Sequence, residues 1–93
     1  MVVELLSVEL YLPGARSLKD KRMVLRRIKD RIRKFNVSVA EVDHHDLWQR
    51  AGLGIVTVAA TSDHADRELA AVVDEIERVE PGLITRTETA LLA

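Results

Sequence analysis

Apolar residues recur along this chain with two periods, one of two residues and one of about 3.6 residues. Residues 2–12 alternate, with one clearly apolar face and one mixed face, and indicate a strand. Residues 37–44 indicate a second strand, although the pattern does not decide which of its faces points inward. Residues 53–62 are apolar on both faces, as in a central strand, and residues 83–91 are threonine-rich and polar enough for a sheet edge.

Two segments carry the helical period instead. The first is predicted to begin at Ser17, because Ser17-Leu18-Lys19-Asp20 has the form of a capping box, and to stop at Asn36. A stripe of about 120° on its helical wheel holds the apolar residues Leu18, Val24, Leu25, Ile28, Ile32 and Phe35. The second helix is predicted to have Asp63 as its cap and to stop at Pro81-Gly82. Its apolar residues at helical spacing are Leu69, Val72, Val73, Ile76 and Val79.

The order of these elements, β-α-β-β-α-β, matches the ferredoxin-like arrangement of the α+β class. Right-handed crossovers place both helices on one face of a four-stranded antiparallel sheet and leave the other face open. We expect the open face to carry alternate residues of the first and third strands, namely Leu5, Ser7, Glu9, Tyr11, Leu53, Ile55, Thr57 and Ala59. Because such a face is too apolar to be left to solvent without a reason, a homodimer through the open sheet face is one interpretation.

Length and composition bound the class of protein. The 93 residues, with 47% hydrophobic content, fit a single domain spanning residues 1–93. Cysteine is absent, which excludes disulfides, thiolate metal sites and a cysteine nucleophile. The N-terminal residues lack the basic region of a signal peptide, and no window approaches the roughly 18 apolar residues of a membrane span, so we expect a cytoplasmic protein without a membrane partner. Abundant arginine, with Asn and Gln once each, is typical of a thermophile or a GC-rich genome.

The net charge of −1 conceals a strong asymmetry. Residues 16–34 hold ten Lys or Arg and two acids, whereas the rest of the chain holds four Lys or Arg and thirteen acids. Five cations of the first predicted helix, spaced three or four residues apart, fall within about 80° of its wheel. These five, here called the basic stripe, are Lys19, Arg22, Arg26, Lys29 and Arg33.

The basic stripe has two interpretations. A row of cations can follow a phosphate backbone, which predicts nucleic-acid binding by these five residues. The structural alternative is a solvated face, or ion pairing with the seven acids between Asp63 and Glu80 on the second helix. Lys21 raises a separate question, because it interrupts the apolar stripe of the same helix. Its ammonium group needs a carboxylate, from Glu9, Glu41 or Asp43, or a route to solvent at the helix end, and we favour the route to solvent.

The second candidate region is Glu41-Val42-Asp43-His44-His45-Asp46-Leu47-Trp48, which concentrates imidazoles and carboxylates. Such groups bind zinc or transfer protons. Adjacent histidines in a strand point to opposite faces, so Asp43 is expected to share a face with His45, and His44 with Asp46. We therefore favour a structural role and predict no metal ligand and no cofactor. Trp48 is expected to anchor this connection on the core or at a subunit contact, and His64 to be a surface residue. The residues kept as ligand or interface candidates are Lys21, Glu41, Asp43, His44, His45, Asp46 and Trp48.

Known catalytic and phosphate-binding signatures are missing. The chain has no P-loop, no G-x-G-x-x-G, no G-x-S-x-G and no H-E-x-x-H motif, so we name no catalytic residue and expect a protein that is not an enzyme. The open sheet face offers only Tyr11 for stacking on bases. Any RNA contact is therefore expected to be electrostatic and to involve the first helix.

Three runs of residues carry a family resemblance: Ser17-Leu18-Lys19-Asp20-Lys21-Arg22, Phe35-Asn36-Val37-Ser38-Val39-Ala40-Glu41 and Asp46-Leu47-Trp48-Gln49. Through them the chain resembles the YlxP-like family of small bacterial proteins, a domain of unknown function, over nearly its whole length. The resemblance implies a ferredoxin-like fold and a gene that often sits near translation-initiation and ribosome-maturation genes. It implies no activity and no catalytic residues.

The leading hypothesis is a non-enzymatic accessory domain that contacts structured RNA or a ribosomal component through the basic stripe. One rival is a self-associating structural or regulatory module that uses the open sheet face. The other is a binder of a small ligand or a metal at residues 43–48.

Overall fold

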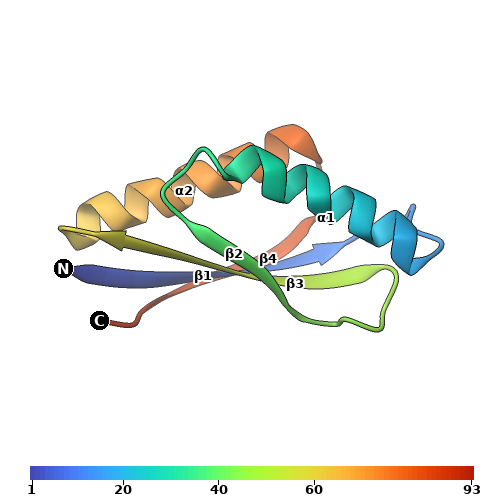
Figure 1. Ribbon diagram of the computed structural model, residues 1–93, viewed down its shortest axis with the longest axis horizontal. Helices are drawn as coiled ribbons and strands as arrows, with labels where there is room; N and C mark the ends of the chain where they lie inside the picture. The colour runs from blue at the N-terminus through green and yellow to red at the C-terminus, as the bar shows by residue number, and fades with distance from the viewer.

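Six elements make up the computed structural model, which describes residues 1–93 (Figure 1). In chain order they are β1 (Val2–Tyr11), α1 (Leu18–Ile32), β2 (Ser38–Asp43), β3 (Arg50–Ala59), α2 (Ser62–Val79) and β4 (Ile84–Leu91). The predicted order is confirmed, and the differences lie at the ends of the elements. The third strand begins at Arg50 rather than at residue 53, which shortens the connection that precedes it.

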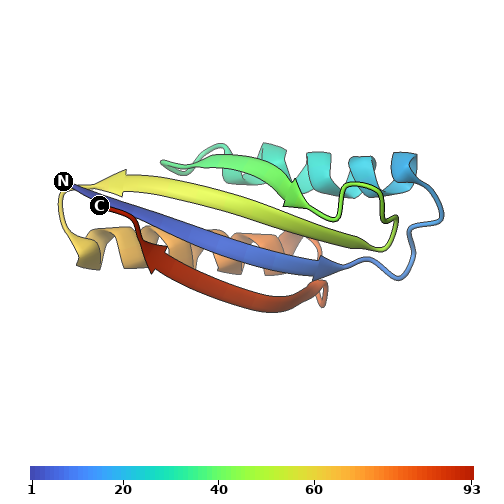
Figure 2. The same cartoon turned by 90° about the horizontal axis from the view of Figure 1, so that it is seen from below.

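The four strands form one antiparallel sheet in the order β2-β3-β1-β4. Both helices lie on one face of this sheet (Figure 1), and Figure 2 shows the strands in front of both helices when the molecule is seen from below. The arrangement confirms the α+β, ferredoxin-like fold. It leaves β2 and β4 as the two edge strands. Neither helix combines the length and the hydrophobicity that a membrane span requires.

The hydrophobic core fills the space between the sheet and the helices. α1 contributes Leu25, Ile28 and Ile32, which are the centre of its predicted apolar stripe. The other buried apolar residues of this core are Leu6, Val8, Leu10, Leu12, Ala15, Ala51, Leu53, Ile55, Leu69, Val72 and Ile76. Burial of the α1 stripe fixes the rotation of that helix, because it turns the charged residues on either flank outward.

The inward face of β3 differs from the expectation. Leu53, Ile55 and Thr57 are at most 1% exposed and lie on the helix-covered face, so they do not line the open face; neither does Ala59. The register explains the difference, because Ile55 pairs with Leu6 of β1. Directly opposite residues of an antiparallel pair point to the same side of the sheet, so β1 decides which β3 residues enter the core. Because β3 is apolar on both faces, its own sequence pattern cannot show which of its faces is buried under the helices.

The helix ends confirm one predicted cap and correct two other boundaries. Ser17 Oγ accepts a hydrogen bond from the backbone N–H of Asp20 at 3.0 Å, which confirms the cap of α1. The cap of α2 is Thr61 rather than Asp63, since Thr61 Oγ1 accepts from the N–H of His64 at 3.2 Å. α1 already ends at Ile32, four residues before Asn36. Asn36 instead ties the connection after α1 to β3, because its side-chain amide donates to the carbonyl of Val58 at 2.9 Å.

Candidate functional site

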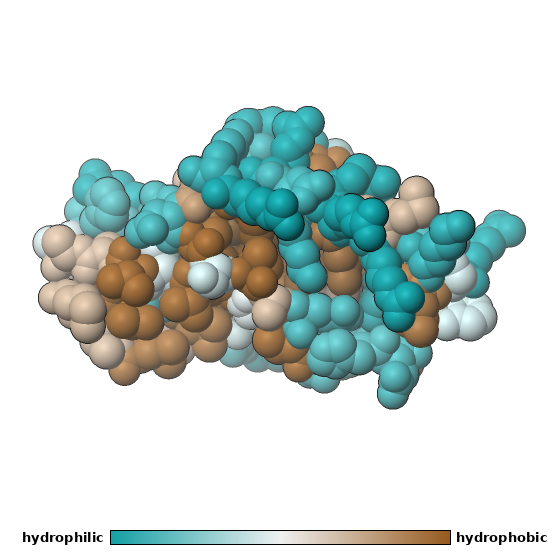
Figure 3. All heavy atoms as spheres, in the orientation of Figure 1, coloured by the Kyte–Doolittle hydropathy of each residue, from teal (hydrophilic) through white to brown (hydrophobic).

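The basic stripe lies on the flank of α1 that borders the edge strand β2. Arg22, Arg26 and Arg33 are exposed, and Lys29 is half-buried. Together with Leu25, Asp30 and Glu41 of β2, these four cations line a shallow groove of about 270 Å³. In Figure 3, hydrophilic residues gather along the helical side of the molecule. The groove therefore brings four of the five cations onto one surface beside an edge strand.

The ion pairs between the two helices fall on the opposite flank of α1. Arg27 lies 3.3 Å from Glu80, while Arg31 and Lys34 lie 3.8 and 3.4 Å from the buried carboxylate of Glu75. None of these three cations belongs to the basic stripe. Ion pairs between the two helices therefore form as expected, but through Glu75 and Glu80 alone and with cations outside the basic stripe. The interpretation that the stripe itself pairs with the acids of the second helix is wrong.

Within the basic stripe, one cation has a carboxylate partner closer than 4.0 Å. Arg33 lies 3.5 Å from Asp30 on its own helix, and both side chains are more than half exposed. An exposed pair of this kind contributes between 0 and about 1 kcal/mol, so a ligand phosphate can displace it at small cost. Lys19, Arg22, Arg26 and Lys29 have no such partner.

Lys21 is fully buried, with 1% of its surface exposed, so the expected escape of its ammonium group to solvent is wrong. Its Nζ lies 2.9 Å from Glu41 Oε2, one of the three proposed carboxylates. It also donates to the carbonyl of His44 at 2.8 Å, and to those of His45 and Arg50 at 3.4 and 3.3 Å. Lys21 thus fastens α1 to the end of β2 and to the connection that leads into β3.

The His44-His45 pair does not continue the strand as expected. A β-bulge shifts the pairing between Glu41 and Asp43, and His44 then adopts a positive φ of 61°. Because of this change in backbone direction, the His44 and His45 rings contact different groups. His44 Nε2 lies 3.2 Å from Glu9 Oε2 of β1 and 3.8 Å from Asp43 Oδ2, whereas His45 Nε2 lies 3.1 Å from the carbonyl of Glu41.

This geometry corrects the predicted pairing of residues. Asp43 comes together with His44 and not with His45, and His44 does not share a cluster with Asp46. Glu9, which the sequence analysis named as an open-face residue and as a possible partner of Lys21, is the third member of the cluster. Glu9 and Asp43 both pair with Gly52, which places them close together. This relation follows from the strand register and could not be found from the sequence pattern.

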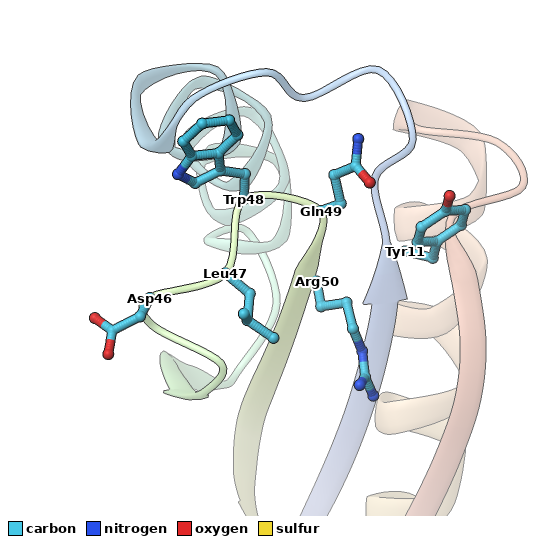
Figure 4. A pocket seen from close by; sticks show the side chains of 6 residues that line it. All are labelled: Tyr11, Asp46, Leu47, Trp48, Gln49 and Arg50. Carbon is cyan, nitrogen blue, oxygen red and sulfur yellow. The ribbon is translucent and has the colours of Figure 1, made fainter.

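Trp48 does not pack on the core, because 53% of its surface is exposed. It lines an open hollow of about 450 Å³ together with Tyr11, Asp46, Leu47, Gln49 and Arg50. Figure 4 shows Trp48 and Tyr11 on either side of this hollow, with Leu47 and Arg50 between them. Gln49 anchors the connection instead, since its amide donates to the carbonyls of Pro13 and Ala15 at 3.3 Å each.

Glu4 is a buried acid that the sequence did not single out. It is 4% exposed and sits beside Asp66, Asp74 and Thr87 in a cleft of about 440 Å³ between α2 and the sheet. Burial raises the pKa of Glu4 above the ordinary 4.5, and a hydrogen bond to Asp66 and the charge of Asp66 add to the effect. The alternation of β1 places Glu4 on the inner face, so its burial could have been found from the pattern.

The open sheet face is divided along its length. Its apolar part includes Val42 and Val58, which are 59% and 50% exposed, and the half-buried Leu5 and Val56. Val42 leans over Gly54, where an added Cβ would lie 3.2 Å from Val42 Cγ1. Figure 3, which views the molecule from the side with the helices above the sheet, shows hydrophobic residues gathered toward the end that carries the N-terminus. The other part of the open face carries Glu9 and the hollow at Trp48.

The sequence from residue 3 to residue 89 matches the family described as a protein of unknown function (DUF503). The chain belongs to the DUF503 family. A relative in this family, the uncharacterized protein YlxP of Bacillus subtilis (strain 168), is 42% identical over 87 residues, which cover 86% of this chain and 90% of the relative. The family resemblance stated from the sequence is confirmed, and the family name carries no activity.

Solved structures support the fold. The de novo designed protein LFR1 1 with ferredoxin fold has a TM-score of 0.57 and 15% identity, covering 100% of this chain and 86% of the other. SnoaB, a cofactor-independent oxygenase from Streptomyces nogalater, has a TM-score of 0.59 and 15% identity, with 98% and 91% of the two chains covered. At these identities the likeness concerns the fold alone.

Proposed function

We propose that this protein is a non-enzymatic accessory domain that binds the phosphate backbone of structured RNA through the basic stripe. The proposal rests on the different pairing of the cations on the two flanks of the first helix. Arg27, Arg31 and Lys34 pair with Glu75 and Glu80, whereas four of the five stripe cations have no carboxylate within 4.0 Å. Cations without a carboxylate partner can bind the phosphates of a polyanion directly.

The dimensions of the stripe suit this ligand. From Lys19 to Arg33 an α-helix rises about 20 Å, a length over which several phosphates of one RNA strand can lie. Arg22, Arg26 and Arg33 would contact phosphate oxygens through their guanidinium forks, and Lys19 and Lys29 would add charge. The groove beside β2 would seat one strand of the RNA, and recognition would depend on shape and charge rather than on base stacking. The gene neighbourhood implied by the family resemblance agrees with an RNA partner.

Two double variants of α1 test the proposal with equal changes of charge. R26Q/R33Q removes two cations of the stripe, and R27Q/R31Q removes two cations of the opposite flank. Binding to a fluorescently labelled ribosomal RNA hairpin is measured by anisotropy between 50 and 300 mM salt, at about micromolar protein. We expect R26Q/R33Q to weaken binding at least about tenfold and to flatten the salt dependence, since fewer counterions are released. R27Q/R31Q should stay within about threefold of the wild type.

Three outcomes would contradict RNA binding through the stripe. Equal losses in the two variants would mean that only net charge matters. An affinity independent of salt would exclude the phosphate backbone as the main contact. Failure of the wild-type protein to bind any structured RNA at low salt would leave an acidic protein as the partner of the stripe.

A second candidate function, self-association, is favoured by the exposure of Val42 and Val58 on the open sheet face. Monomeric proteins seldom expose contiguous apolar patches without a use for them. A second copy of the chain would cover the patch in a two-fold pairing. Light scattering coupled to gel filtration tests this: we expect a dimer that V42K/V58K converts to a monomer, and a wild-type monomer at all concentrations would rule the pairing out.

A further inference from the structure

Three side chains, one from β1 and two from the end of β2 and the residue after it, converge on one point of the open face. They are Glu9 of β1, Asp43 at the end of β2, and His44, which follows it. One ligand atom from each, an oxygen from either carboxylate and an imidazole nitrogen, lies within 4.8 Å of the other two. None of the three belongs to the basic stripe, so this cluster is independent of the proposed RNA contact.

The fold gives a physical reason for this convergence. Glu9 and Asp43 are both register partners of Gly52, one on each side of β3. A Cβ at position 52 would lie 2.8 Å from Asp43 Cβ, a separation that real Cβ atoms do not adopt. Glycine therefore allows Asp43 to sit close over β3, and a side chain at position 52 would force a shift at this contact.

The backbone around His44 holds the imidazole in place. The positive φ of 61° is one that histidine adopts more readily than most residues, and it turns the ring away from the course of β2. The N–H of His44 donates to Asp43 Oδ1 at 2.8 Å, and its carbonyl accepts from the buried Lys21 at 2.8 Å. Both backbone polar groups of His44 thus make hydrogen bonds, which fixes the backbone from which the ring projects.

Two of the converging atoms, one from Glu9 and one from His44, lack a hydrogen-bond partner. Glu9 Oε2 and His44 Nε2 are both inaccessible to solvent, and neither makes a hydrogen bond of acceptable geometry, although they lie 3.2 Å apart. Buried polar atoms without partners destabilise a fold, and more so when they are charged. A cation between them would satisfy both atoms at once. The Glu9–His44 and His44–Asp43 separations of 3.2 and 3.8 Å bracket the ~3.4 Å expected between tetrahedral ligands about 2.1 Å from a zinc ion.

We infer that Glu9, Asp43 and His44 form a binding site for a divalent transition-metal ion of the Zn²⁺ type. An imidazole nitrogen with two carboxylates suits zinc and its first-row neighbours, whereas Mg²⁺ and Ca²⁺ prefer oxygen ligands alone. Three protein ligands leave one position of a tetrahedral ion open, as in sites that bind a further water or ligand.

Arg50 is a charged neighbour of the cluster on the open face. Arg50 pairs with Tyr11, which places it two residues from Gly52 on the same face of the sheet. Figure 4 shows the Arg50 side chain extending along the strands, away from Trp48. Arg50 therefore adds a positive charge to the same face of the sheet as the cluster.

Zinc titration of tag-free protein, freed of metal by a chelator, tests the site by isothermal calorimetry. We expect one Zn²⁺ per chain, with millimolar Mg²⁺ unable to compete. His44→Ala and Asp43→Asn should each weaken binding at least about tenfold. His45→Ala is the matched control, since that ring faces the carbonyl of Glu41, and it should stay within about threefold of the wild type. The His44 ring resonances should shift on zinc addition in the wild-type NMR spectrum.

Several results would overturn the site. Binding of less than one zinc per chain, unchanged affinity in both His44→Ala and Asp43→Asn, or a loss confined to His45→Ala would each do so. Asp43 is 65% exposed in its side chain, so its variant should fold even if the histidine variant does not. R26Q/R33Q should keep full zinc affinity, and the failure of either proposal is therefore distinguishable from the failure of the other.

Discussion

Replacing Lys21 with Met is expected to destabilise the protein strongly, although the side chains have similar lengths. The wild-type ammonium group lies 2.9 Å from Glu41 and 2.8 Å from the carbonyl of His44, with two further carbonyls at 3.3 and 3.4 Å. Met supplies no donor, so the carboxylate and the carbonyls lose their partner. Breaking a buried ion pair from one side costs about 3–5 kcal/mol. Because 17% of the Glu41 side chain is exposed and water can reach it, we expect the lower end, about 3 kcal/mol.

Urea unfolding followed by far-UV circular dichroism measures this loss. With a slope of about 1–3 kcal/mol/M, a loss of about 3 kcal/mol lowers the midpoint by about 1–3 M and leaves the slope unchanged. Lys19→Met is the matched control, because Lys19 is an exposed lysine in the same turn of α1. Its effect should stay within about 0.5 kcal/mol.

A double-mutant cycle separates the ion pair from the contacts to the carbonyls. Glu41→Gln keeps an acceptor for Lys21 but removes the charge, and we expect it to cost less than Lys21→Met. The cycle of the two variants should yield a coupling energy of about 0.5–3 kcal/mol. If Lys21→Met unfolds within about 1 kcal/mol of Lys19→Met, the argument that this ammonium group secures the β2–β3 connection is wrong.

Two further predictions concern Glu4 and Gly52. Because burial raises the pKa of Glu4 above 4.5, the folded state holds that proton more tightly than the unfolded chain, and stability declines as the pH rises from 4.5 through the raised pKa. Glu4→Gln does not titrate, so its melting temperature relative to the wild type should be higher at pH 8 than at pH 4; an equal difference at both pH values would contradict the assignment. Gly52→Ala should cost about 1–3 kcal/mol through the 2.8 Å contact with Asp43, whereas Gly14→Ala, which meets nothing within 4 Å, should cost less than about 0.5 kcal/mol in the same urea assay. Equal costs for the two alanine variants would show that Asp43 moves aside freely.

The sequence alone determined the features that depend on neighbours along the chain. The order of strands and helices follows from the two hydrophobic periods, and the cap at Ser17 follows from a hydroxyl three residues before Asp20. The inner face of β1 was also predictable, because Leu6, Val8 and Leu10 alternate with more polar residues. These features need no knowledge of distant parts of the chain.

Tertiary structure decided the features that depend on contacts between strands and helices far apart in the sequence. The register with β1 chose the inner face of β3, since β3 is apolar on both sides. The position of α2 decided that Arg27 and Arg31, rather than the basic stripe, meet its acids. Lys21 is buried because three carbonyls of a distant connection reach its ammonium group, which no local pattern encodes.

The cluster of Glu9, Asp43 and His44 shows the same limit most clearly. Glu9 is more than thirty residues away from Asp43 and His44 in the chain, and the convergence of the three depends on Gly52, a bulge in β2 and one positive φ. Periodicity predicted His44 on the wrong side because it assumes that a strand continues. The residue types of the site were visible in the sequence, but their geometry was set by strand pairing, which joins residues that are far apart in the chain.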